Sequence, residues 1–153
     1  MFQTVELGQK VGKGEYKTRE LLLRQQLLDL QQQLRANRGF PVIIDFAGVS
    51  GAGKSTSTNL LNKWMDARWI NTQGYAEPAG FEKERPEFWR FWRDLPPRGQ
   101  IGIYLSGRYS RPLLDYVYDR IPQETFMQKL EHINHFEKAL ADERIALMFL
   151  TLV

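Results

Sequence analysis

The sequence predicts an α/β fold with a mostly parallel sheet, and three observations carry this prediction. Apolar runs of strand length alternate with stretches whose apolar residues recur at helical spacing. The order of strand, helix, strand, helix, strand, helices and strand is typical of a three-layer sandwich with helices on both faces of the sheet. The third observation is a glycine-rich motif, Gly48–Ser55, directly after the first apolar run.

This motif reads Gly-Val-Ser-Gly-Ala-Gly-Lys-Ser and fits G-x-x-x-x-G-K-[ST], the phosphate-cradling P-loop. The apolar run Pro41–Ala47 precedes it and the helical stretch Thr56–Asp66 follows it, which is the context the motif requires. Glycines let backbone N–H groups turn inward around an anion, and the helix adds its positive N-terminal end. A chance glycine-rich turn explains eight spaced residues and two matching flanks far less well.

The motif assigns candidate roles to its members. We expect Lys54 to reach the outer phosphates as a catalytic group and the Ser55 hydroxyl to hold a magnesium ion, Mg2+. The residues expected to bind phosphate or nucleotide here are Gly48, Ser50, Gly51, Ala52, Gly53, Lys54, Ser55 and Thr56.

The chain before the motif reads as a loose arm, Met1–Gly14, and a helix, Glu15–Asn37. The helix carries one stripe of leucines at positions 23, 27, 30 and 34. The stripe lasts under three heptads, so packing on the rest of the domain is favoured over a coiled coil. We therefore predict an N-terminal arm and helix over residues 1–40 and a core over residues 41–153.

The remaining predicted elements follow the motif. They are strands at 71–76, 100–105 and 145–153, a short aromatic helix beginning at Pro86, a helix from 108–112 to near Ile121 and a helix over 122–141. In the short helix, Phe88, Phe91 and Trp92 are expected to pack in the core, and Trp89 is a candidate for stacking on a base.

Composition narrows the class of protein. Hydrophobic residues make up 42% of the 153 residues and charged residues 25%, as in an ordinary soluble domain. The absence of cysteine excludes disulfides and thiolate chemistry and fits a cytoplasmic location, and no apolar run is long enough for a membrane span. A net charge of +3 does not argue for nucleic acid, but six arginines stand against two carboxylates between Arg85 and Arg111. Arginine suits bidentate phosphate contacts, which makes Arg108 and Arg111 candidates.

Two features leave the function open. Asp45 stands inside an apolar strand, where it either has a buried partner or points to a cleft. The third strand ends in Ile103–Gly107, with no carboxylate where one is expected to help hold magnesium. The sequence therefore predicts phosphate binding strongly and catalysis weakly. Because the chain stops inside an apolar strand, we also expect it to be a piece of a longer protein.

Several segments resemble the polyphosphate kinase 2 family, and more closely the N-terminal half of its two-domain members. The resemblance covers most of residues 38–153, and its most specific part is the aromatic block followed by Leu-Pro-Pro-Arg-Gly. The segments that carry it are Gly48–Lys54, Leu60–Asp66, Arg85–Trp92, Leu95–Ile101, Tyr109–Pro112 and Phe136–Leu140.

The resemblance implies a thymidylate kinase-like P-loop fold with a helical lid, which would follow Val153. It implies transfer of a phosphoryl group between inorganic polyphosphate and AMP or ADP with Mg2+; two-domain members turn AMP into ADP. Carried over by position, Lys54 binds phosphate, Arg111 matches the arginine after the third strand and Tyr109 the tyrosine near it. It also implies a second homologous domain and a homo-oligomer.

This sequence departs from the family at both acids that handle magnesium. Active members carry an aspartate at the position of Ser50 and Asp-Arg at the position of Leu105–Ser106. Ser55 replaces a small residue, usually glycine. The chain thus resembles the degenerate copy of a polyphosphate:AMP phosphotransferase. Two alternatives stay open: a non-catalytic phosphate-binding or dimerisation scaffold, and an ATP-dependent small-molecule kinase.

Overall fold

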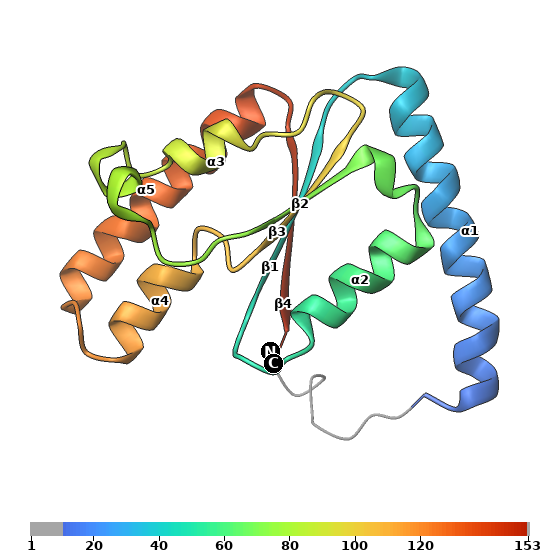
Figure 1. The fold of residues 1–153 in the computed structure, drawn as a ribbon, viewed down its shortest axis with the longest axis horizontal. Coiled ribbons are helices and arrows are strands. Elements are labelled where there is room, and N and C mark those ends of the chain that lie inside the picture. Colours follow the sequence, from blue (N-terminus) through green and yellow to red (C-terminus); the bar gives the residue numbers. More distant parts are fainter. Residues whose placement is uncertain (1–10, 153) are drawn as a thin grey trace.

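The computed structural model describes residues 11–152, in which one four-stranded parallel sheet lies between two layers of helices (Figure 1). The strand order is β2-β3-β1-β4. The strands are β1 (Val42–Gly48), β2 (Ile70–Gly74), β3 (Ile101–Leu105) and β4 (Ala146–Leu152). The predicted α/β sandwich with a parallel sheet is confirmed.

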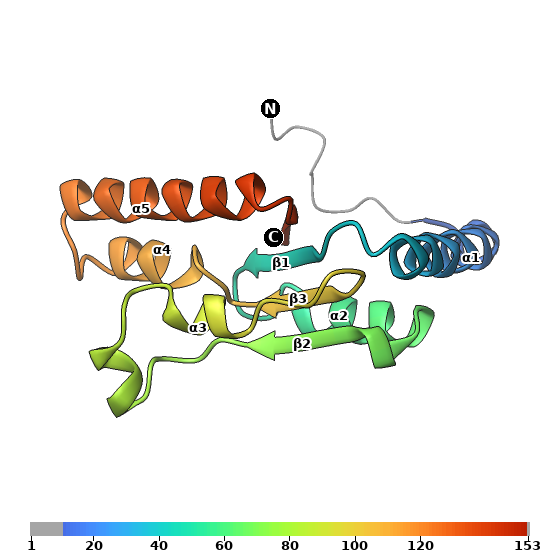
Figure 2. The same ribbon diagram turned by 90° about the horizontal axis from the view of Figure 1, so that it is seen from above.

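Helices cover both faces of the sheet, as Figures 1 and 2 show. The helices on one face are α1 (Lys13–Asn37) and α2 (Lys54–Trp64). Those on the other face are α3 (Trp89–Arg93), α4 (Ser110–Val117) and α5 (Gln123–Asp142). A helix layer on each side buries both faces of β1, which explains why this strand is apolar almost throughout.

Alternation along β1 divides the core into two clusters. Ile43 packs with Phe91 of α3 and Phe136 of α5 on one face. Ile44 and Phe46 point to the other face and pack against the α1 and α2 side. Asp45 follows the alternation of Ile43, so its carboxylate points toward α5 and away from α2.

The second half of α1 is tied to the core. Leu27 and Leu34 pack against the cluster beneath α2. Between them, the buried Gln31 side chain exchanges two hydrogen bonds with the backbone of Asp66: its Nε2 donates to the carbonyl at 3.0 Å and its Oε1 accepts from the N–H at 2.8 Å.

Over residues 11–152, no helix has an apolar stretch long enough to cross a membrane.

Some predicted details were wrong. Helix α2 begins at Lys54 rather than Thr56, so the end of the motif is helical, and α4 ends at Val117, before Ile121. Two short 3-10 helices, Ala67–Trp69 and Gly80–Glu84, were not predicted. Trp92 is 45% exposed and meets Phe136 edge to face, because a five-residue helix cannot bury its three aromatic side chains on one face. Most of the predicted N-terminal arm lies outside the described residues.

Candidate phosphate-binding site

The glycine-rich loop joins the end of β1 to the start of α2 at the carboxyl edge of the sheet. Gly53 caps α2 with φ +88°, a left-handed conformation that glycine adopts without steric cost. The first hydrogen bond inside α2 runs from the Ser57 N–H to the Gly53 carbonyl at 2.9 Å. The N–H groups of Lys54, Ser55 and Thr56 precede it, and no side chain within residues 11–152 caps this helix end. The loop thus offers backbone donors and a positive helix end to an anion.

Lys54 lies over this loop. Its half-buried Nζ donates to the carbonyl oxygens of Gly48 and Val49, each at 2.7 Å. The ammonium is therefore held within the loop by weak carbonyl partners, which a phosphate oxygen can replace with a stronger charged contact. Ser50 and Ser55 are exposed beside it. The structure thus brings the predicted residues of Gly48–Thr56 together.

The donor set beside the loop does not fit a magnesium site built by this segment. Protein-bound Mg2+ takes at least one carboxylate together with substrate phosphates. Ser55 supplies a hydroxyl, but β3 ends in Leu105 and Asp45 points to the opposite face of the sheet. Within residues 11–152, no group of three or more histidine, aspartate or glutamate side chains could hold a metal ion.

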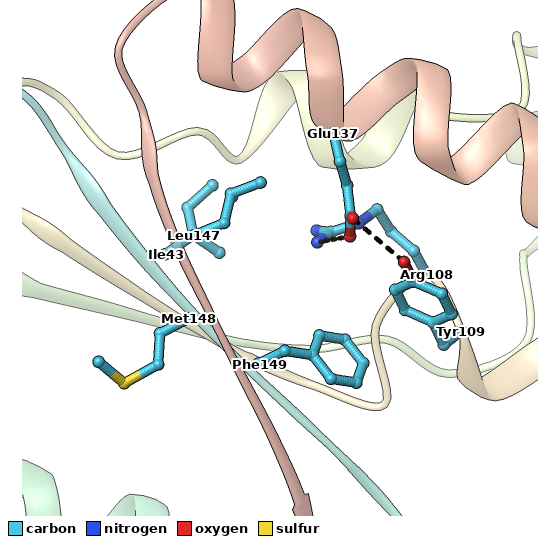
Figure 3. A pocket seen from close by; sticks show the side chains of 7 residues that line it. All are labelled: Ile43, Arg108, Tyr109, Glu137, Leu147, Met148 and Phe149. Atoms are coloured by element: carbon cyan, nitrogen blue, oxygen red, sulfur yellow. Dashed lines mark hydrogen bonds and ion pairs between the residues drawn. The ribbon is translucent and has the colours of Figure 1, made fainter.

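Arg108 is buried, and its guanidinium points toward Glu137, as Figure 3 shows. Its Nη1 lies 3.4 Å from Oδ2 of Asp45 on β1, and its Nη2 donates to Oε1 of Glu137 on α5 at 2.9 Å. The Tyr109 hydroxyl donates to the other oxygen of Glu137 at 3.1 Å. Asp45 thus has a buried partner, one of the two readings left open by the sequence.

Burial governs the charge of Asp45, which is 1% exposed. Desolvation raises the pKa of its carboxyl group from 3.8 to about 6. The attraction of Arg108 opposes this rise, and the negative charge of Glu137 adds to it. The carboxyl group is therefore poised to change charge just below neutral pH.

The variant Asp45→Asn should make the protein more stable at neutral pH. The folded protein holds the Asp45 proton more tightly than the unfolded chain does, so the stability gained from this group is complete below about pH 4 and is lost as the pH rises through about 6. Asparagine carries no charge in either state. We expect both proteins to unfold with similar free energies near pH 4, and the variant to exceed the parent by about 3 kcal/mol at pH 7. Urea unfolding at both pH values measures this, and equal stabilities at pH 7 would contradict it.

Arg111 lies at the start of α4, on the surface. Its Nη1 is 3.2 Å from Oε1 of Glu77 and its Nε is 2.9 Å from Oδ2 of Asp115. These partners raise the pKa of the guanidinium, led by the hydrogen bond to Asp115. The side chain is half exposed, so Arg111 can exchange a carboxylate for a phosphate without opening the core.

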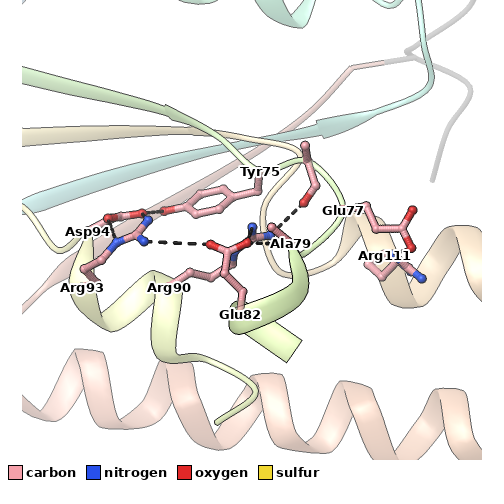
Figure 4. A network of polar contacts seen from close by, with 9 residues as sticks. Tyr75, Glu77, Ala79, Glu82, Arg90, Arg93, Asp94 and Arg111 are labelled. Carbon is pink, nitrogen blue, oxygen red and sulfur yellow. Dashed lines mark hydrogen bonds and ion pairs between the residues drawn. The ribbon is translucent and has the colours of Figure 1, made fainter. Parts of the chain in front are cut away.

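Two other arginines of the positive window, Arg90 and Arg93, contact carboxylates in the network of Figure 4, whereas Arg85 and Arg98 are exposed. Arg90 contacts Glu82 at 2.7 Å, and Arg93 contacts Asp94 at 2.6 Å. Arg93 also lies 5.0 Å from the ring of Trp89. Part of the arginine excess seen in the sequence is therefore neutralised by carboxylates, and the Trp89 ring already lies beside the guanidinium groups of Arg93 and Arg85.

Glu137 is the site residue that the sequence did not reveal. It holds the two consecutive residues Arg108 and Tyr109, yet it stands in α5 like any other helical acid. Asp45 carried a signal, a charge in an apolar strand, but that signal did not name its partner. A contact between residues so distant in sequence leaves no local pattern.

A parallel sheet with a glycine-rich loop between β1 and α2, and with Lys54 at the helix start, defines a P-loop protein of the kinase type. The family model described as Polyphosphate kinase 2 matches residues 10–152. The chain therefore belongs to the polyphosphate kinase 2 family.

Individual relatives agree with this assignment. The chain is 41% identical over 149 residues to a polyphosphate:AMP phosphotransferase of Pseudomonas aeruginosa and 32% identical over 143 residues to that of Pseudomonas syringae. These matches cover 97% and 94% of this chain. The crystal structure of a polyphosphate kinase 2 from Pseudomonas aeruginosa superposes with a TM-score of 0.93 at 39% identity, over 99% of this chain and 33% of the other.

A polyphosphate kinase 2 from Arthrobacter aurescens shares the fold, with a TM-score of 0.87 at 21% identity over 95% of this chain. The chain spans only 30% and 29% of the length of the two Pseudomonas phosphotransferases.

Proposed function

We propose that this segment is a phosphate-binding copy of the P-loop domain in a polyphosphate:AMP phosphotransferase, and that groups outside the segment complete the transfer. One observation carries the proposal: the loop joins free helix-start N–H groups to the Lys54 ammonium, while β3 ends without a carboxylate. Such a site binds phosphate oxygens but lacks the acids that position metal in phosphoryl transfer.

The proposed substrates are inorganic polyphosphate as donor and AMP as acceptor, giving ADP, in the cytoplasm. The names of the Pseudomonas relatives support this choice. Their greater length leaves room for a second homologous domain, and the expected homo-oligomer stays a prediction. If the phosphates carry Mg2+, the Ser55 hydroxyl would contact the ion and Lys54 would neutralise the adjacent oxygens.

Kinetics of the longest natural form of the protein test this proposal. With magnesium, polyphosphate and AMP, we expect ADP as the product. In Lys54→Ala we expect the KM for polyphosphate to rise by about tenfold, the effect of losing one charged contact, with a smaller fall in kcat. A kcat that falls by several orders of magnitude would place the chemistry at this loop instead.

An ATP-dependent kinase is the second candidate, because Gly48–Ser55 is a complete Walker-type motif. The same assay with ATP in place of polyphosphate separates the two. Faster ADP formation from ATP and AMP than from polyphosphate and AMP, at equal phosphate concentration, would favour this second function.

A further inference from the structure

The loop between β3 and α4 is held by buried charges from two sides. Arg108 stands in this loop with its side chain 1% exposed, between Asp45 of β1 and Glu137 of α5. Figure 3 shows its contact with Glu137. Tyr109, the next residue, bonds to the same Glu137. The N–H of Ser106, at the start of the loop, donates to the Phe46 carbonyl at 3.2 Å, two residues before the phosphate-binding loop. The β3–α4 loop is thus hydrogen-bonded to the end of β1.

The backbone of the loop is fitted closely to Asp45. Ser106 adopts φ +56°, a left-handed conformation that is strained for a residue with a side chain. The next residue, Gly107, lies so close to the Asp45 carboxylate that a β carbon there would overlap it. The position of this loop therefore depends directly on Asp45.

The charges of this cluster do not balance, because one guanidinium stands between two carboxylates. The backbone N–H groups of Gly107 and Arg108 lower the pKa of Asp45, but among the described residues neither of its oxygens accepts a hydrogen bond of good geometry, and Nε and Nη1 of Arg108 donate none. A buried charge that is only partly satisfied costs stability, so the ionised cluster is strained. A cavity of about 440 Å³, lined by Arg108, Tyr109 and Glu137 together with Phe149 of β4, leaves room for movement.

We propose that Asp45 and Glu137 are positioning residues that act through Arg108 to hold the β3–α4 loop at the phosphate-binding end of the sheet, and that ionisation of Asp45 loosens this loop. The loop carries Tyr109 and leads to Arg111. The effect on phosphate binding rests on the proposed function above, whereas the effect on the loop does not.

Linkage between ionisation of Asp45 and opening of the loop determines which form of the loop ionisation favours. Opening the loop gives the Asp45 carboxylate access to water, where its pKa returns toward the ordinary value, so loss of the proton favours the open form. The charged and titratable groups facing Asp45 are Arg108 in the loop, Glu137 on α5 and Tyr104 on β3. Burial raises the pKa of Tyr104, and it raises that of Tyr109 to about 12, so both tyrosines stay neutral. Phe91 of α3 faces Arg108 with an apolar ring.

Amide hydrogen exchange followed by NMR tests the loop. The N–H groups of Ser106 and Ser110 bond to Phe46 and Gly107, so their protection, corrected for intrinsic rates, reports loop closure, and Ile103 in β3 reports global opening. Between pH 5 and pH 7.5 we expect the protection of both serines to fall about tenfold relative to Ile103, because about one pH unit separates pH 5 from the Asp45 pKa of about 6, above which the fall levels off. In Asp45→Asn the protection should stay at its pH 5 level.

Two further variants complete the design. Asp29→Asn, which removes an exposed carboxylate of α1, should keep the parent profile. Arg108→Gln should move the midpoint to higher pH, because Arg108 is the main influence that lowers the pKa of Asp45. The proposal would be overturned if the protection of the two serines in the parent did not change with pH relative to Ile103. It would also be overturned if their protection in Asp45→Asn fell with pH as it does in the parent. The parent measurement alone suffices if a variant does not fold.

Tripolyphosphate binding tests the link to function. The ratio of dissociation constants of Asp45→Asn and the parent, taken at each pH, cancels the ionisation of the ligand itself. We expect this ratio to be near one at pH 5 and to differ from one by several-fold at pH 7.5. A constant ratio, with the exchange profile as expected, would overturn the effect on phosphate alone. If neither protein binds tripolyphosphate at any pH, the proposed function fails and the exchange data still decide the loop.

Discussion

Replacing Lys54 by alanine should weaken the binding of polyphosphate to this segment by about tenfold or more. The Lys54 ammonium lies over the loop and, among the described residues, is bonded only to the carbonyls of Gly48 and Val49, so its charge is available to a phosphate oxygen. Losing one charged hydrogen bond costs about 1.5–3 kcal/mol, and each 1.4 kcal/mol is tenfold in affinity. Calorimetric titration with polyphosphate of defined length measures the loss.

Lys63→Ala is the matched control. Lys63 is exposed in the last turn of the same helix, so its removal changes the net charge equally at the far end from the loop. We expect this variant to bind nearly as the parent does. The difference between the two variants should shrink as salt is added, because dissolved ions screen the contact of a half-exposed ammonium. Equal affinities for Lys54→Ala and Lys63→Ala at every salt concentration would show that phosphate binds elsewhere.

The variant Gly48→Ala should destabilise the protein and weaken the same site. Gly48 is the last residue of β1, has φ +134° and pairs with Leu152 at the end of β4. A β carbon at this position would overlap the Leu152 carbonyl oxygen, so either β4 or the loop must move. Overpacking and a strained backbone together should lower the free energy of unfolding by about 3 kcal/mol, which corresponds to a fall of roughly 10 °C in Tm.

Gly39→Ala serves as its control, because no atom lies within 4 Å of the β carbon it would add. Thermal unfolding of the three proteins, followed by polyphosphate titration at a temperature where all are folded, gives both effects. A Tm for Gly48→Ala within about 2 °C of the control, an amount expected for a change under 1 kcal/mol, would contradict the close approach of β4 to the loop.

Local sequence patterns predicted most of the fold. Apolar runs predicted β1, β3 and β4, because strands of a parallel sheet covered by helices are apolar almost throughout, whereas β2 reads Ile-Asn-Thr-Gln-Gly and carries no such run. The glycine spacing and Lys54 predicted the phosphate loop, since both act over eight consecutive residues. The ends of α2 and α4 were less well predicted, because helix boundaries depend on capping and packing as much as on sequence.

The arginine window shows the limit of such patterns. Its excess of positive charge predicted phosphate contacts, but Arg90 and Arg93 meet Glu82 and Asp94, and Arg108 meets Asp45 and Glu137. A count of charges along the chain does not say which of them meet in space. Arg111, at the surface, keeps the exposure that a phosphate contact requires.

The sequence by itself determined the class of fold, the phosphate loop and the lack of a carboxylate at the end of β3, because each of these is written in neighbouring residues. Only the tertiary structure decided that Asp45, Arg108 and Glu137 form one buried cluster and that Gly48 lies against Leu152. The buried cluster and the contact of Gly48 with Leu152 share one physical reason. A parallel sheet places side by side strands and helices that are distant along the chain, and the charge of a buried group depends on the residues that these elements place around it.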